Sequence, residues 1–128
     1  MKVLVADEVR MSLKHSLNSI AGVQIVGQAR NAELAGSLAG FTKPDVILVD
    51  VEASGHRGVM TARDLRDLLP EVRVLVLGEA DSRELVTQAA RAGILGCIVD
   101  RASPTELLEA IRGAIHSRQV GFLDLTEN

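Results

Sequence analysis

The chain has 128 residues, of which 47% are hydrophobic and 24% are charged, and its formal net charge is −3. This length fits one domain with its own core, and the ordinary composition excludes a disordered or low-complexity chain. The mild acidity argues against a nucleic-acid-binding surface, which requires clustered basic residues. The apolar runs are far shorter than the roughly 20 residues that a membrane helix needs.

The chain has one cysteine, Cys97, which cannot form an internal disulfide. We expect Cys97 to be a small buried apolar residue in a reducing compartment. The first residues run directly into a strand-like pattern, without the basic stretch and apolar segment of a signal peptide. A cytoplasmic location is therefore expected.

Short apolar runs alternate with longer amphipathic segments along the chain. Strands are predicted over residues 3–6, 23–27, 46–49, 72–77 and 96–99, and helices over residues 11–20, 31–39, 59–69, 82–92 and 104–115. Ser103 is suited to cap the last helix, with Glu106 completing a capping box. The residues that follow helix ends, where a left-handed conformation is favoured, include Gly22, Gly40 and Gly93.

Five strand–helix units in succession predict an α/β fold of the flavodoxin-like (βα)5 type, with a five-stranded parallel sheet between helices. Such folds carry their functional residues at the carboxyl ends of the strands. Asp7 and Glu8 follow the first strand, and Asp50 ends the third. Three carboxylates suit Mg²⁺, which would screen a phosphoryl group arriving at Asp50. Solvated loop residues or helix caps are the alternative interpretation of these acids.

The ordered set of motifs resembles the receiver domain of bacterial response regulators over nearly the whole chain. It rests on the acid pair at 7–8, the strand ending at Asp50, Gly58 and the Ala92-Gly93 pair. Residues 96–104, GCIVDRASP, resemble the family's G-Y-L-L-K-D-A-S-P, a version usual in LuxR-type regulators.

The resemblance implies that Asp50 accepts phosphate from a histidine kinase, with Mg²⁺ held by Asp7, Glu8 and Asp50. It also implies a homodimer, formed either through the helix at 82–92, the strand at 96–99 and the helix at 104–115, or through the helices at 11–20 and 104–115. A receiver is a signalling domain, so no enzymatic activity is expected.

Several positions depart from the family pattern. Gly78 stands where the family has a Ser or Thr that binds the phosphate, and Asp100 stands where a lysine pairs with it. Cys97 replaces the aromatic switch residue, and Ala53-Ser54 replaces a Met-Pro pair. A further carboxylate near the acids would repel a phosphoryl dianion.

These departures favour an atypical receiver whose output does not depend on phosphorylation in the usual way, and in which Mg²⁺ binding is weak or absent. A conventional receiver remains open if Arg101, Arg57 or His56 supplies the missing positive charge. A third hypothesis is a small-molecule-binding domain, in which Gly78 leaves space for a ligand over the sheet.

The chain is divided into a receiver domain at residues 1–118 and an extended tail or linker at 119–128. The tail includes Leu125-Thr126-Glu127, which resembles the Leu-Thr-x-x-Glu opening of the helix-turn-helix domain in LuxR-type regulators. The resemblance implies a transcription factor that contacts DNA only through a domain beyond residue 128. A stand-alone adaptor is the competing hypothesis.

Overall fold

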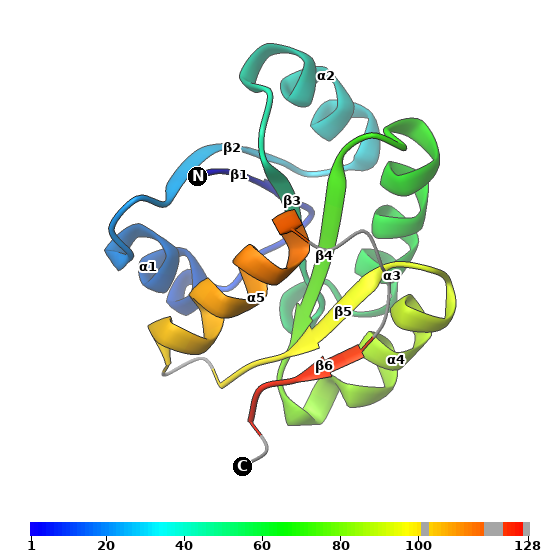
Figure 1. Cartoon of the computed structure of the whole chain (residues 1–128). Helices are drawn as coiled ribbons and strands as arrows, with labels where there is room; N and C mark the ends of the chain where they lie inside the picture. The colour runs from blue at the N-terminus through cyan, green and yellow to red at the C-terminus, as the bar shows by residue number, and fades with distance from the viewer. Residues whose placement is uncertain (101–102, 117–121, 127–128) are drawn as a thin grey trace.

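The protein forms one parallel sheet with helices on both faces (Figure 1). The computed structural model describes residues 1–100, 103–116 and 122–126. The strands are β1 (Lys2–Ala6), β2 (Gln24–Ala29), β3 (Val46–Asp50), β4 (Arg73–Gly78), β5 (Leu95–Ile98) and β6 (Phe122–Asp124). The helices are α1 (Met11–Ser19), α2 (Ala32–Thr42), α3 (Val51–Leu68), α4 (Arg83–Arg91) and α5 (Pro104–His116), with a 3-10 turn η1 (Ala80–Ser82) before α4.

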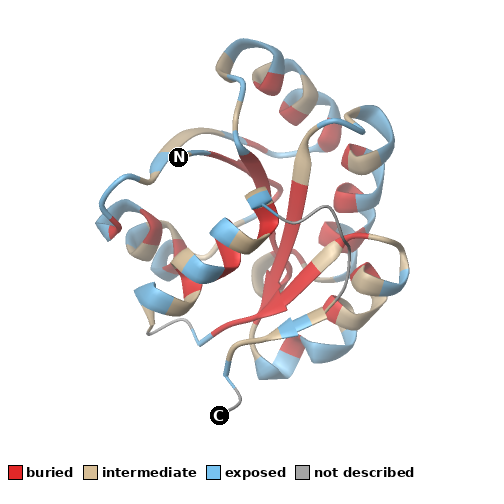
Figure 2. Ribbon diagram, viewed as in Figure 1, coloured by how far each residue is buried: buried red, intermediate tan, exposed pale blue. Residues whose placement is uncertain are grey.

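The sheet has the strand order β2-β1-β3-β4-β5-β6, and every neighbouring pair is parallel. Helices α2, α3 and α4 pack on one face, where Leu65 and Val86 are buried, and α1 and α5 cover the other, where Leu17 and Ile111 are buried. Figure 2 shows the central strands buried along most of their length. Since helices cover both faces, the apolar runs of β1, β3 and β4 are continuous rather than alternating. The predicted flavodoxin-like fold class is confirmed.

Helix α3 begins at Val51, whereas its start was predicted at residue 59. Asp50 caps it by accepting a hydrogen bond from the Glu52 backbone N–H. Gly55 interrupts the helical backbone at φ 62° and ψ −145°, so two helical segments meet there at a kink. A conformation of this kind is readily adopted only by glycine.

The second difference is β6, which pairs with β5 and makes the sheet six-stranded rather than five-stranded. Gly22 and Gly93 adopt the predicted left-handed conformation, at φ 85° and 87°. The prediction for Gly40 was wrong, because Gly40 lies inside α2 and Lys43 takes the left-handed position at φ 48°.

The Ser103 cap of α5 is confirmed, since its Oγ accepts a hydrogen bond from the Glu106 N–H at 3.2 Å. Glu106 does not complete the box as predicted: its Oε1 accepts a hydrogen bond from the Asp100 N–H at 3.4 Å. Within the described part of the chain, no helix is long and apolar enough to cross a membrane.

Candidate functional site

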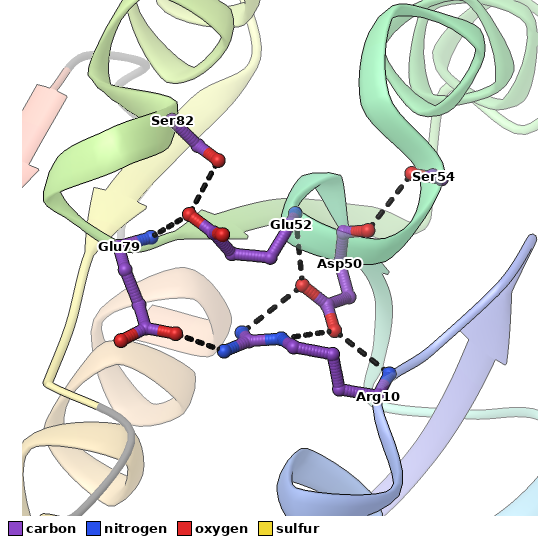
Figure 3. Close-up of polar contacts among 6 residues, drawn as sticks. All are labelled: Arg10, Asp50, Glu52, Ser54, Glu79 and Ser82. Atoms are coloured by element: carbon purple, nitrogen blue, oxygen red, sulfur yellow. Dashed lines mark hydrogen bonds and ion pairs between the residues drawn. The ribbon is translucent and has the colours of Figure 1, made fainter.

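Asp50, at the end of β3, is fully buried and carries hydrogen bonds on both carboxylate oxygens (Figure 3). Oδ2 accepts from the Arg10 backbone N–H at 3.0 Å and from Arg10 Nε at 2.8 Å. Oδ1 accepts from Arg10 Nη2 at 3.1 Å and from the Glu52 N–H at 3.1 Å. The guanidinium therefore binds this carboxylate in a bidentate manner, the strongest geometry for such a pair.

Arg10 lies immediately before α1, and its guanidinium extends beyond Asp50 to the carboxylate of Glu79, with which Nη1 forms an ion pair. Glu79 follows β4, so one side chain links the start of α1 to the ends of β3 and β4 (Figure 3). Burial alone would lower the pKa of Arg10, but the hydrogen bonds and charge of Asp50, with Glu79 and Glu52, raise it above its usual value. Arg10 is therefore a fixed positive charge in this site.

Glu52 makes a second connection between α3 and the segment that leads into α4. Its Oε1 accepts hydrogen bonds from the Glu79 backbone N–H at 3.0 Å and from the Ser82 hydroxyl. Figure 3 shows this connection running beside the Arg10–Glu79 ion pair. The start of α4 is thus tied to the Asp50 region twice, once through Arg10 and once through Glu52.

Gly78, at the end of β4, does not open space as the small-molecule hypothesis expected. A Cβ at this position would lie 2.7 Å from Val86 Cγ2, 3.0 Å from Ser82 Cβ and 3.2 Å from Val51 Cγ2. The expectation was wrong because α4 packs closely on β4 at this point. Gly96 makes a similar contact, since a Cβ there would lie 2.8 Å from both Val86 Cγ1 and the Val86 carbonyl oxygen. Val86 therefore occupies a slot between two glycines.

Asp7, at the end of β1, is bound by a different arginine. It has a φ of 65°, which aspartate tolerates better than most residues. Arg57 contacts its carboxylate with Nε at 3.2 and 3.3 Å and with Nη2 at 2.7 Å, and the Thr61 hydroxyl donates at 2.9 Å. Burial raises the pKa of Asp7, but the hydrogen bonds from Arg57, the Glu8 backbone and Thr61 outweigh it and lower the pKa below the usual value.

Mg²⁺ is the cation that the family implies, and these acids do not form a site that fits it. Arg10 saturates Asp50, Arg57 binds Asp7, and Arg57 Nη2 lies 3.3 Å from Glu8 Oε1. Across residues 1–100, 103–116 and 122–126, no three histidine, cysteine or acidic side chains gather as a metal-binding group. Binding by Asp7, Glu8 and Asp50 stays a prediction, and it would require both arginines to leave.

In the part of the chain that the structure describes, the contacts given above for Asp50 and Asp7 involve none of the remaining candidate residues named from the sequence. Asp100 and His56 are exposed. Arg101 lies outside the described residues. Cys97 is buried in β5, and burial raises the pKa of its thiol to about 12, with smaller contributions from Asp124 and Glu106. A thiol with this pKa is not a nucleophile at neutral pH.

A groove of about 800 Å³ lies beside Asp7, next to the start of α2. It is lined by Asp7, Glu8, Gln28, Ala29, Arg30, Asn31, Leu34, Leu38 and Arg57. Small-molecule binding stays a prediction, and this groove is a more suitable place for it than the closed packing at Gly78.

Sequence reasoning missed the residue that contributes most to the site. Arg10 was not among the candidates for the missing charge, although it lies two residues after Glu8 in a loop at the predicted site. A basic residue in that loop was the available signal. Glu52, Glu79 and Ser82 were also missed as a network, because their contacts depend on how α4 packs against β4.

Comparisons with known proteins agree with this fold. Residues 3–112 match the model of the response regulator receiver domain, so the chain belongs to that family. It is 36% identical over 114 residues to the response regulator GacA of Pseudomonas aeruginosa, covering 87% of this chain and 53% of GacA. It is 28% identical over 128 residues to the nitrate/nitrite response regulator protein NarL of Escherichia coli, covering 98% of this chain and 57% of NarL.

Among solved structures, a two-component response regulator of the LuxR family from Aurantimonas sp. superposes with a TM-score of 0.71, covering 93% of this chain and 87% of that one. At 22% identity this likeness shows the shared fold. The receiver assignment and its LuxR-type relationship are confirmed. The chain spans about half the length of the curated relatives it matches.

Proposed function

We propose that this domain is an atypical receiver in which Arg10, rather than a phosphoryl group, fixes the signalling state. The single observation that carries the proposal is the saturation of the fully buried Asp50 by four hydrogen bonds, three of them from Arg10. A phosphoacceptor must present a carboxylate oxygen to the incoming phosphorus. Here both oxygens already accept from donors that hold them in place.

Displacing Arg10 is energetically unfavourable. Removing one partner of a buried ion pair typically costs about 3–5 kcal/mol, because the other charge is left without compensation. A phosphoryl donor would also meet the Glu79 carboxylate, which the Arg10 guanidinium holds close to Asp50, and close carboxylates repel a dianion. The reversal of charge at Asp100 points in the same direction.

The same contacts suggest what Arg10 does in place of phosphate. It connects Asp50 to Glu79, and Glu52 connects α3 to Ser82, so the start of α4 is held in one position without phosphorylation. The slot formed by Gly78 and Gly96 lets Val86 pack closely on β4 and β5 in that position. We therefore propose a receiver with one constitutive arrangement of α4, read by a partner or by an attached domain.

Because the curated relatives are about twice as long, we further propose that the domain regulates a transcription factor whose DNA-binding domain lies beyond residue 128. The expected homodimer, the cytoplasmic location and the division at residue 118 belong to this proposal. No enzymatic activity is part of it. A conventional receiver phosphorylated by a histidine kinase is the alternative.

Beryllofluoride with Mg²⁺, a mimic of the aspartyl phosphate, tests the proposal in an NMR titration. We expect the amide signals of Asp50, Glu52 and Glu79 to remain unchanged in the wild-type protein. The control variant Arg63→Ala, which lacks an exposed arginine of α3, should likewise show unchanged signals. Saturable shifts at Asp50 and Glu79 in the wild-type protein would contradict the proposal and favour the conventional alternative.

A further inference from the structure

The tail strand β6 occupies the outer edge of β5. Phe122, Leu123 and Asp124 pair with Gly96, Cys97 and Ile98, and the Leu125 N–H donates to the Ile98 carbonyl oxygen at 3.0 Å. Figure 1 shows β6 lying beside β5 and next to α4. Without β6, the edge of β5 would present unpaired backbone groups, which invite pairing with another chain.

Side chains of β6 and of Leu125, which follows it, alternate between the two helices that flank this edge. Phe122 packs with the core on the α4 side, and Leu125 packs with the core on the α5 side. Leu123 points toward α5, since a Cβ at Gly113 would lie 3.8 Å from Leu123 Cδ1. The tail strand therefore fills the surface formed by α4, β5 and α5.

Arg83, at the start of α4, holds the strand from the α4 side. Its guanidinium forms an ion pair with Asp124 and lies 5.4 Å from the centre of the Phe122 ring. Hydrogen bonds from Thr126 and Arg83 hold the pKa of Asp124 below its usual value, so Asp124 stays charged at neutral pH. Arg83 follows directly after Ser82, which is bound to Glu52.

Because β6 pairs with β5, the edge strand that another molecule can contact is β6 rather than β5. A four-residue edge of Leu95, Gly96, Cys97 and Ile98 is replaced by a three-residue edge that contains Asp124. Short edge strands with charged residues are a common means by which proteins prevent edge-to-edge association. The partner that fits the uncovered edge is a second copy of this chain, since identical edges pair readily about a twofold axis.

We infer that β6 is an intramolecular mask, which keeps the surface formed by α4, β5 and α5 from pairing with a second copy while Arg83 holds the strand in place. This goes beyond the proposed function, since neither Asp50 nor Arg10 contributes to it. It favours α1 and α5 over the masked surface for any dimer of the intact chain.

Charge variants of the full chain test the mask. Arg83→Glu places two carboxylates together and removes the ring contact, so hydrogen exchange at residues 122–126 should accelerate by at least about tenfold. In sedimentation velocity, the mass of the sedimenting species should double relative to the wild type. The dissociation constant of this association should be at least about tenfold lower than in the wild type. Asp124→Arg should act in the same direction, and the double variant Arg83→Glu with Asp124→Arg should reverse most of both effects by restoring an ion pair.

Arg91→Glu is the matched control, because Arg91 is an exposed arginine of the same helix and lies at its opposite end. It should change neither exchange at residues 122–126 nor the mass. Faster exchange in Arg83→Glu without stronger association would overturn the mask, and unchanged exchange would overturn the role of Arg83. A double variant that fails to reverse either effect would also contradict the inference. Circular dichroism on each variant verifies that the sheet and helices are intact.

Discussion

Two arginine–carboxylate pairs lie at neighbouring strand ends, and they differ mainly in the access of water. The Asp50 and Arg10 side chains are 0% and 15% exposed, whereas Asp7 is 2% exposed and its partner Arg57 is 61% exposed. Both arginines bind through Nε and Nη2. Similar bonding geometry therefore occurs in one enclosed pair and one pair that borders a groove.

Hydrogen-bond geometry alone therefore does not decide how much such a pair contributes to stability. An exposed arginine is already solvated, and forming the pair releases little free energy. An enclosed pair is costly to break from one side, because the remaining charge has neither water nor a counter-charge beside it. We therefore assign the functional role to Arg10 and a mainly structural role to Arg57.

Removing each arginine separately is the strongest way to test this contrast. Arg10→Ala should lower the free energy of unfolding by about 3–5 kcal/mol, because Asp50 would remain buried without its counter-charge. Arg57→Ala should cause a clearly smaller loss, since Thr61 and the Glu8 N–H still bind Asp7. Urea unfolding of both variants measures the difference, and equal losses would remove the distinction between the pairs.

The close packing beside Asp50 allows a second test. Gly78→Ser should destabilise the fold by about 1–3 kcal/mol, because the new Cβ would contact Val86, Ser82 and Val51 too closely. Gly36→Ser is the matched control, since a Cβ at Gly36 meets nothing within 4 Å. Urea unfolding should place the control within about 0.5 kcal/mol of the wild type. A tolerated Gly78→Ser would mean that α4 is not fixed as proposed.

The smallest expected effect is the pH dependence of the Asp7 pair. The folded-state pKa of Asp7 is lowered, so the unfolded state binds more protons and stability rises with pH. The contribution should be complete above the unfolded pKa of about 4 and lost as pH falls through the folded value. The free energy of unfolding, measured by urea at several pH values in this range, should depend less steeply on pH in Arg57→Gln than in the wild type. An unchanged dependence on pH would contradict the assignment.

Much of the fold followed from local pattern. The apolar runs located the first five strands, and the acids at 7, 8 and 50 located the candidate site, because parallel strands of this kind end at one edge. The start of α3 was predicted too late, because Ser54, Gly55 and Gly58 are residue types that are common in loops. In the structure, Gly55 forms a kink. Gly58 lies against Ser54, and a Cβ at Gly58 would lie only 1.8 Å from Ser54 Oγ.

The parts that could not be predicted depend on contacts between distant residues. Arg10 and Asp50 are separated by 40 residues, and Glu52 and Ser82 by 30. No periodicity marks such a pair. Strand β6 was expected only as an extended tail, because three residues become a strand only when β5 supplies the hydrogen-bond partners. The sequence shows that Gly78 lacks a side chain, but it does not show that Val86 packs closely against Gly78.

Phosphorylation of Asp50 is the most direct test of the central claim. The wild-type protein is incubated with acetyl phosphate and Mg²⁺, and its intact mass is then measured by mass spectrometry, with Asp50→Asn as the blank. The account predicts no gain in mass, because Arg10 and the Glu52 N–H hold both oxygens of Asp50. A gain of one phosphate that is absent from the Asp50→Asn variant would contradict it.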